Sequence, residues 1–353
     1  MIEMTAEPVL RLEGVDKDFS QANSILGSIK NRVLGRDVEQ LHAVDDVSLT
    51  LRRGEVQGII GESGCGKTTL LKTIAGLHEP SKGDIIYRGE NITEYTTKEW
   101  KEYRKNVQII FQDPFNSLDP KYPVKEALAE PLKIHDVDDI EDRVVNVLKD
   151  VKLDPPERYL DRYPDELSGG EKQRVAIARA LVLDPDLILA DEPVSMLDVS
   201  TQAAILEDLN DITTQQDVSM LYISHDLSTV SYICDRVNVM YLGRIVESSE
   251  TRDLLDEPLH PYTQELMAAI PVPDPFAERE RTQIQGNPAN PIGLPGGCRF
   301  KDRCVERMDI CDTTPNDIET NDQTEHQVAC HLHYDHTATD DVAVSANGGD
   351  GHE

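Results

Sequence analysis

One eight-residue stretch constrains this chain more than any other, because it sets glycines at fixed spacing ahead of a lysine and a threonine. It follows an apolar run at 56–60 that predicts a buried strand, and it leads into 69–75, which predicts a helix. A strand, a glycine-rich loop and a helix in this order are typical of a phosphate-binding loop. The loop consists of Gly61, Glu62, Ser63, Gly64, Cys65, Gly66, Lys67 and Thr68, and Thr69 follows it.

The residue types in this loop suit a nucleotide with its magnesium ion. Glycines let successive backbone N–H groups turn toward phosphate oxygens, and the start of the next helix adds positive partial charge. The Lys67 ammonium is expected to reach the β- and γ-phosphates of the nucleotide, and the Thr68 hydroxyl to bind Mg²⁺. A chance glycine-rich turn is the alternative, but both the spacing and the flanking elements fit the motif.

The charge balance excludes one class of partner. The chain of 353 residues carries 66 acidic and 35 basic residues, a formal net charge of −31. Nucleic-acid binding through a broad surface needs basic patches, so no nucleic-acid partner is expected. The scattered acidic residues resemble those of halophile proteins, whose salt-rich cytoplasm screens self-repulsion. An acidic protein of ordinary salinity is the alternative.

Neither a membrane span nor a signal peptide is expected. No run of 18 or more apolar residues occurs, and residues 1–5 lack the basic and then apolar pattern of a leader. The chain is therefore expected in the cytoplasm.

Strand-like and helix-like segments alternate along most of the chain, which predicts an α/β fold with a largely parallel sheet. The short apolar run 187–190 is typical of a strand covered on both faces. Residues 20–40 are polar and predict a long loop or hairpin insertion. Further strands are expected at 9–14, 47–51, 85–87, 107–111, 219–223 and twice within 236–246, and helices at 125–134, 140–151, 172–183 and 203–209.

A second, acidic element accompanies the phosphate loop. Asp191 and Glu192 follow the strand expected at 187–190. An aspartate at the end of a buried strand can share Mg²⁺ with Thr68, and the adjacent glutamate is placed to polarise an attacking water. The two residues therefore predict nucleotide hydrolysis, and an ordinary turn at a strand end is the alternative.

A third element precedes the helix expected at 172–183. Ser168, Gly169 and Gly170 offer a hydroxyl and backbone N–H groups at a helix start. Such groups bind anions, although a simple helix cap is the alternative.

With this element the sequence resembles the ATPase subunits of ABC transporters. Residues 167–171 match the signature loop of that family, with Glu171 where glutamine is commoner. The resemblance covers about residues 8–257. It implies a P-loop ABC ATPase domain with a RecA-like core, an antiparallel β subdomain and a helical signature subdomain.

Several other residues match the same family one by one. Gln112 matches the Q-loop glutamine, which in the family senses Mg²⁺ and the γ-phosphate and contacts the membrane partner. His225 matches the switch histidine, which holds the γ-phosphate. Asp198 lies in a segment that resembles the D-loop, where Met196 replaces the usual alanine. Phe19 lies where the family stacks an aromatic ring on adenine, although a core residue is the alternative.

The resemblance also implies partners. In this family two ATPase domains pack head to tail, and each ATP lies between the phosphate loop of one and the signature loop of the other. Ser168, Gly169 and Gly170 would therefore serve the ATP of a second ATPase subunit. ATP closes the pair and hydrolysis reopens it. Two transmembrane permease subunits take up the movement, so the chain is expected as a peripheral subunit on the cytoplasmic face of the cell membrane.

Details of the motifs point to one branch of the family. Segments 111–120, 162–167 and 260–263 resemble the ATPase subunits of oligopeptide and dipeptide importers, and the F-type more than the D-type. These importers usually pair one of each type, so a heterodimer is expected, with an extracellular peptide-binding protein acting indirectly. Nickel and oligosaccharide importers share the architecture and stay open as alternatives.

Two other classes fit less well. A soluble ABC ATPase of DNA repair or translation would need a long coiled-coil insertion or two motif sets, and the chain has neither. A regulatory module that binds nucleotide without turnover is disfavoured because both Glu192 and His225 are present.

Four of the six cysteines lie in a short stretch of the C-terminal region. Their context resembles the extension of peptide importers, in which four cysteines bind a [4Fe–4S] cluster of structural role. Four thiolates suit that cluster or zinc, and a site without metal is the third possibility. The other two, Cys65 and Cys234, are expected to be packing residues. The four candidate ligands are Cys298, Cys304, Cys311 and Cys330.

The sequence thus predicts three parts. Residues 1–258 would form the ABC nucleotide-binding domain, with a helical subdomain at about 115–170. Residues 259–335 would form a small extension that holds the four cysteines. Residues 336–353, which are small, polar and acidic, are expected to be a disordered tail.

Overall fold

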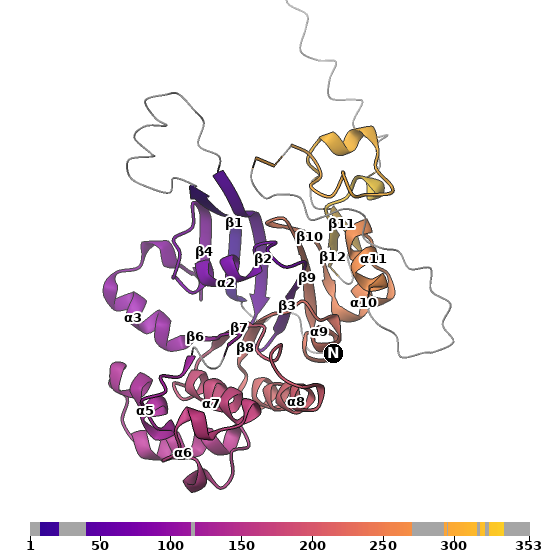
Figure 1. The fold of residues 1–353 in the computed structure, drawn as a ribbon. Helices are drawn as coiled ribbons and strands as arrows, with labels where there is room; N and C mark the ends of the chain where they lie inside the picture. Colours follow the sequence, from indigo (N-terminus) through magenta and orange to yellow (C-terminus); the bar gives the residue numbers. More distant parts are fainter. Residues whose placement is uncertain are drawn as a thin grey trace, which may run out of the picture.

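Two sheets, a group of helices and a small C-terminal unit make up the fold (Figure 1). The predicted tail at 336–353, and the predicted insertion at 20–40 apart from its two end residues, lie outside the described residues. The computed structural model describes residues 8–20, 40–113, 117–269, 293–294, 296–315, 318–321 and 325–334.

The larger sheet has a parallel centre. Strands β9, β3, β8, β7 and β6 run parallel, whereas β10, β12 and β11 continue the sheet antiparallel at one edge. Every residue of β3, β7, β8 and β9 is buried, which explains their apolar sequences and confirms the predicted α/β fold. Across the sheet the order is β11 (Ile318–Asn321), β12 (His326–Val328), β10 (Arg244–Glu250), β9 (Arg236–Tyr241), β3 (Val56–Ile60), β8 (Ser219–Ile223), β7 (Leu187–Asp191) and β6 (Val107–Ile110).

The smaller sheet is antiparallel, as the family resemblance implied. One face of it is apolar, because residues such as Leu10, Leu12, Leu49 and Leu51 are buried at alternating positions. That face packs into one core with helix α2 (Lys67–Ile74), so the sheet lies against the helix that follows the phosphate loop. Its strands are, in order, β2 (Gln40–Arg52), β1 (Pro8–Ser20), β4 (Lys82–Tyr87) and β5 (Glu90–Asn91).

Three helices form a compact group on the far side of the large sheet from the small one (Figure 1). Two of them match the helices predicted at 125–134 and 140–151 to within one residue. The third begins at Gly169 rather than 172, because Ser168 caps it. The three are α5 (Val124–Ile134), α6 (Ile140–Asp150) and α7 (Gly169–Leu181).

The described residues form five further helices. Of these, α8 was predicted only over 203–209. Helix α3 was not predicted, although Thr96 and Glu99 form a capping box at its start, which is a recognisable helix signal. The five are α3 (Thr97–Asn106), α8 (Val199–Gln216), α9 (Leu227–Ile233), α10 (Thr251–Asp256) and α11 (Pro261–Ala268).

The C-terminal unit is joined to the rest of the fold through the edge of the large sheet. Strand β12 pairs with β10, and the buried Glu247 of β10 lies 2.8 Å from Nε2 of His326. Glu325 accepts two hydrogen bonds of 2.9 Å from Arg52 of the small sheet. In the part of the chain that the structure describes, no helix combines the length and apolar character needed to cross a membrane.

Candidate functional site

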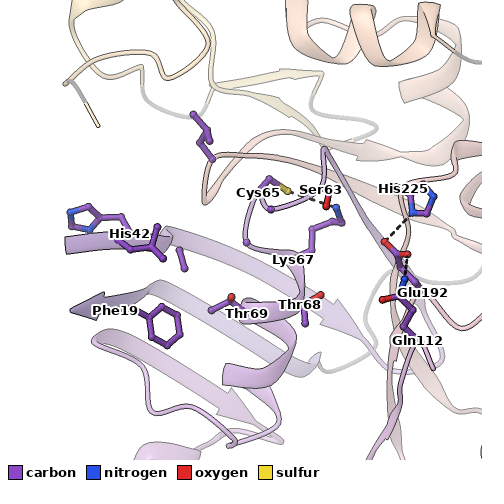
Figure 2. A pocket seen from close by; sticks show the side chains of 15 residues that line it. Phe19, His42, Ser63, Cys65, Lys67, Thr68, Thr69, Gln112, Glu192 and His225 are labelled. Atoms are coloured by element: carbon purple, nitrogen blue, oxygen red, sulfur yellow. Dashed lines mark hydrogen bonds and ion pairs between the residues drawn. The ribbon is translucent and has the colours of Figure 1, made fainter. Parts of the chain in front are cut away.

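A cavity of about 520 Å³ lies over the phosphate loop, a volume suited to a nucleotide. Figure 2 shows Phe19 and His42 at one end, Glu192, Gln112 and His225 at the other, and the loop between them. Leu41, His42, Ala43 and Leu242 were not predicted, because no motif marks them. The cavity is lined by Phe19, Leu41, His42, Ala43, Ser63, Gly64, Cys65, Gly66, Lys67, Thr68, Thr69, Gln112, Glu192, His225 and Leu242.

Two glycines of the loop occupy positions that no other residue could take. Gly66, with φ 112°, precedes α2, and a Cβ atom there would lie 2.0 Å from the carbonyl oxygen of Ala43. A Cβ atom on Gly61 would lie 2.1 Å from the carbonyl oxygen of Met240. The loop is therefore packed against β2 and β9, which fixes the direction of its N–H groups.

Lys67 folds back over its own loop. Its Nζ donates to the carbonyl oxygens of Gly61 at 2.7 Å and Glu62 at 3.1 Å, and the side chain is buried. The ammonium charge thus stands beside the loop where phosphate oxygens would lie.

The two residues predicted to share Mg²⁺ meet directly. The Thr68 hydroxyl donates to Oδ1 of Asp191 at 3.1 Å, across the start of α2 and the end of β7. Burial raises the pKa of Asp191, and this hydrogen bond opposes the rise. Hydroxyl and carboxylate oxygens are the ligands that Mg²⁺ prefers, so the donor set fits the ion.

Glu192 is held at both its backbone and its carboxylate. It has φ 48°, a conformation that costs about 1–3 kcal/mol, and its N–H donates to the carbonyl oxygen of Ile223 at 2.9 Å. Gln112 donates to Oε2 at 2.9 Å, and Nδ1 of His225 lies 2.9 Å from Oε1 (Figure 2). Two segments far from Glu192 in the sequence therefore fix its carboxylate at the edge of the cavity.

Phe19 lies at the end of the cavity opposite Glu192 (Figure 2). Its ring stands edge-on to His78 at 5.5 Å between centroids, and the Lys17 ammonium lies 5.2 Å from its centre. The ring is only partly buried, so it lines the cavity and is not a core residue.

The signature residues lie outside this cavity, at the starts of two helices. Ser168 caps α7, where its Oγ accepts from the N–H of Glu171 at 3.3 Å. Asp198 caps α8, and hydrogen bonds from Ser200 and Thr201 lower its pKa to about 2. A Cβ atom on Gly170 would lie 2.7 Å from a methyl carbon of Thr201. Gly169 and Gly170 therefore lie beside the D-loop, away from this chain's own phosphate loop.

The four late cysteines come together in the C-terminal unit. Cys311 and Cys330 are buried, Cys298 and Cys304 half-buried, and the N–H of Cys298 donates to the carbonyl oxygen of Cys311 at 2.9 Å. Burial raises the pKa of Cys330 to about 11, and the nearby charge of the other three sulfurs adds to the rise. Among the described residues, no group of three or more side chains is set as a metal-binding site.

Backbone N–H groups point at these sulfurs. Burial raises the pKa of Cys298, Cys304 and Cys330, and in each case the N–H of the residue two positions later opposes the rise. The sulfur of Cys311 accepts from the N–H of Met308 at 3.5 Å. Such N–H···S bonds stabilise thiolates, so the environment of the sulfurs suits a thiolate-bound metal, although their positions do not form a ligand set.

Comparison with known proteins decides the family. Residues 44–195 match the ABC transporter family, and residues 246–311 match the C-terminal region of oligopeptide/dipeptide transporters. The Bacillus subtilis oligopeptide transport ATP-binding protein AppF is 41% identical over 340 residues, covering 94% of this chain and 100% of AppF. The chain belongs to the ATP-binding subunits of the oligopeptide/dipeptide ABC transporter family. The predicted family, fold and enzyme class, an ABC transporter ATPase, are thereby confirmed.

A further relative and two solved structures support the same family. The oligopeptide transport protein OppF of Haemophilus influenzae is 42% identical over 298 residues, which cover 83% of this chain and 89% of OppF. The structure of the ATP-binding cassette MJ0796, a dimer bound to ADP and Pi, matches 69% of this chain and 99% of its own, with TM-score 0.58 and 27% identity. The structure of cbiO1 from Clostridium perfringens, part of the transporter complex cbiONQ, matches 71% of this chain and 92% of cbiO1, with TM-score 0.60 and 28% identity.

Proposed function

We propose that this subunit hydrolyses ATP at a site completed by a second ATPase subunit, and so powers a membrane importer of oligopeptides or dipeptides. The observation that carries the hydrolysis step is the Glu192 carboxylate, fixed by Gln112 and His225 at the edge of the cavity. A carboxylate held in this way can accept a proton from the water that attacks the γ-phosphate. Thr68, Asp191 and Gln112 would hold Mg²⁺, which when bound would neutralise charge on the phosphates.

The second subunit supplies the other half of the site. Ser168, Gly169 and Gly170 lie outside this chain's cavity, so they would serve the ATP of the companion. Met196 and Val199, beside Asp198, are 64% and 82% exposed, and apolar side chains so exposed suit a contact between subunits. We propose a heterodimer of two related ATPase chains.

The membrane connection comes through two permease subunits. Phe111 and Tyr122 are 40% and 46% exposed on either side of the segment that follows Gln112. These apolar side chains would dock the permeases, which places the subunit on the cytoplasmic face of the membrane. An extracellular peptide-binding protein would deliver the cargo from the other side.

Uptake measurements test the cargo. Cells that lack this chain would receive either the wild-type gene or the Glu192→Gln variant, and uptake of labelled dipeptides and oligopeptides would be followed. We expect only the wild-type gene to restore peptide uptake. Uptake of nickel or an oligosaccharide that depends on the chain, with unchanged peptide uptake, would overturn the peptide assignment.

For the four cysteines we propose a structural [4Fe–4S] cluster, with zinc as the alternative. The proximity of Cys298, Cys304, Cys311 and Cys330 and the N–H groups directed at their sulfurs support a metal-thiolate site. Protein purified without air should show broad visible absorption and matching iron and sulfide contents. A colourless preparation with one zinc per chain would replace the cluster by zinc, and one without metal would refute both.

We also propose that the protein is adapted to high salt. With a net charge of −31, self-repulsion should destabilise the fold wherever salt does not screen it. Fluorescence-detected unfolding in molar and in dilute KCl tests this. Equal stability in the two buffers would show that the acidic composition has another origin.

The division into residues 1–258 and 259–335 is likewise a proposal. It is supported by the way the later residues attach, through β12 at the edge of the sheet and through Glu325. Limited proteolysis should cut first between the two parts if the boundary is right, and cleavage elsewhere would move it.

A further inference from the structure

One arginine of the C-terminal unit reaches into the phosphate loop. Arg303, the residue before Cys304, donates from Nη1 to Oε2 of Glu62 at 2.9 Å and from Nη2 to Oε1 at 2.8 Å. The two side chains are 7% and 19% exposed. A bidentate pair of this kind is among the strongest and most directional contacts between side chains, and here water screens it little.

Aromatic rings fix the arginine in place. The guanidinium lies 5.7 Å from the ring centres of both Tyr241 and Phe300, and it donates to the Tyr241 hydroxyl at 3.2 Å. Tyr262 packs against both rings, and its hydroxyl accepts from the N–H of Glu62 at 2.9 Å. Glu62 is therefore held at its backbone by α11 and at its carboxylate by the C-terminal unit.

The position of Glu62 matters for the lysine that meets ATP. The carbonyl oxygens of Glu62 and Gly61 are the acceptors for the Lys67 ammonium. A shift of Glu62 would move one of these carbonyls, and with it the charge that faces the phosphates.

A second arginine connects the same unit to the cavity. Arg299, the residue after Cys298, donates to the carbonyl oxygen of Leu242, which lines the cavity, and to the carboxylate of Asp45. The chain segment that carries two of the cysteines thus contacts the phosphate loop at Glu62 and the cavity lining at Leu242.

We propose that Arg303 is a positioning residue for ATP binding, and that it couples the four-cysteine unit to the nucleotide cavity. The inference rests on the proposed function only in taking ATP as the ligand of the loop. Coupling is reciprocal, so if the C-terminal unit strengthens ATP binding, ATP stabilises the C-terminal unit by the same free energy.

A double-mutant cycle on the full chain tests the contact. Binding of a fluorescent ATP analogue would be measured for the wild type, Arg303→Gln, Glu62→Gln and the double variant. We expect each single variant to raise Kd about tenfold, equivalent to about 1.4 kcal/mol, and the double variant to raise it no further. Arg307→Gln is the matched control, because Arg307 lies in the same unit but pairs with Asp302 and Asp312.

Two further measurements separate positioning from a structural role. Hydrogen exchange over 296–315 should slow on ATP binding in the wild type, and this protection should vanish in Arg303→Gln. Arg303→Lys keeps the charge and one hydrogen bond, so its Kd should be intermediate; it also replaces Arg303→Gln if that variant does not fold. A lowered melting temperature with an unchanged Kd would show a structural role and overturn the inference.

The outcomes also distinguish this inference from the proposed function. A wild-type chain that does not bind the ATP analogue would refute the proposed function. A wild-type chain that binds it, together with variants that bind it equally well or lose affinity additively, would refute only the role of Arg303.

Discussion

The two halves of the proposed ATP site are built in different ways. In the phosphate-loop half, side chains from distant segments contact one another, as Thr68 does with Asp191 and Gln112 with Glu192. In the signature half, the hydrogen bonds of Ser168 and Asp198 are helix caps that span only three residues. The phosphate-loop half consists of Lys67, Thr68, Gln112, Asp191, Glu192 and His225, and the signature half of Ser168, Gly169, Gly170 and Asp198.

This difference indicates which half of the site a single chain can form by itself. The phosphate-loop half is arranged by one chain, because its residues contact one another within that chain. The signature half has its geometry fixed locally but lies outside the cavity of its own chain. One chain should therefore bind ATP, whereas turnover should depend on two.

The largest effect is expected inside the phosphate-loop half. Glu192→Gln keeps the shape of the side chain but removes the proton acceptor, so turnover of the assembled transporter should fall about 10²–10⁴-fold. ATP binding should stay within a few-fold of wild type, since Lys67 and Thr68 are untouched. Steady-state hydrolysis and nucleotide binding check both statements. Wild-type turnover in this variant would remove Glu192 from the mechanism.

A change in the signature half should separate ATP binding from turnover more sharply than Glu192→Gln does. A Cβ atom on Gly169 would meet nothing closer than 3.6 Å, so Gly169→Asp should fold. Its carboxylate would face the companion's γ-phosphate, and turnover of the assembled pair should fall about 10²-fold, as when a preorganised donor is lost. ATP binding by the isolated chain should not change. If binding by the isolated chain falls instead, the signature half serves its own cavity and the comparison fails.

Acid should destabilise α11, whose Tyr262 holds the backbone of Glu62 in the phosphate loop. His260 caps α11, is fully buried, and has its pKa lowered from 6.5 to about 4 by burial; Glu247 and His333 are the charged groups that face it. The folded state keeps the ring neutral while the unfolded chain takes up a proton below pH 6.5. The contribution to stability is therefore complete above pH 6.5 and falls by about 3 kcal/mol as the pH drops to 4.

Urea unfolding at a series of pH values measures this loss. His260→Asn keeps a capping acceptor but does not titrate, so the difference between wild type and variant should shrink with acid. A difference that stays constant from pH 6.5 to 4 would contradict the assignment.

The smallest effect concerns the cap of the signature half. Ser168→Ala removes the acceptor for the N–H of Glu171 and should lower the free energy of unfolding by about 1 kcal/mol. Thermal unfolding of the isolated chain, with Ser231→Ala as an exposed control, measures it. A larger loss would mean that the signature half is held by more than its helix caps.

The sequence predicted well those features that consecutive residues determine. The strand, loop and helix around Lys67 follow from local spacing, and the buried strands follow from unbroken apolar runs such as 219–223. Asp191 and Glu192 could be assigned to the end of a strand because they follow such a run, 187–190. Their order along the chain matched the family, which also indicated Gln112 and His225.

Contacts between distant residues could not be predicted in this way. Glu62 and Arg303 are 241 positions apart, and each is one of many charged residues in the chain. The wall of the cavity includes Ala43 and Leu242, whose types carry no chemical signal. The start of α7 was missed because the two glycines disfavour a helix, whereas the cap at Ser168 outweighs them.

The pairing of β12 with β10 has a consequence for how the protein stays in solution. Without β12, the edge of the large sheet would present unpaired N–H and C=O groups of β10, together with the buried carboxylate of Glu247, to other molecules. Open strand edges are sites of aggregation, and natural proteins cover them. The C-terminal unit thus replaces the seven-residue edge strand β10 by the four-residue strand β11, and short edge strands pair less readily with other chains. A chain that ended after β10 should therefore lose solubility as well as its cysteines.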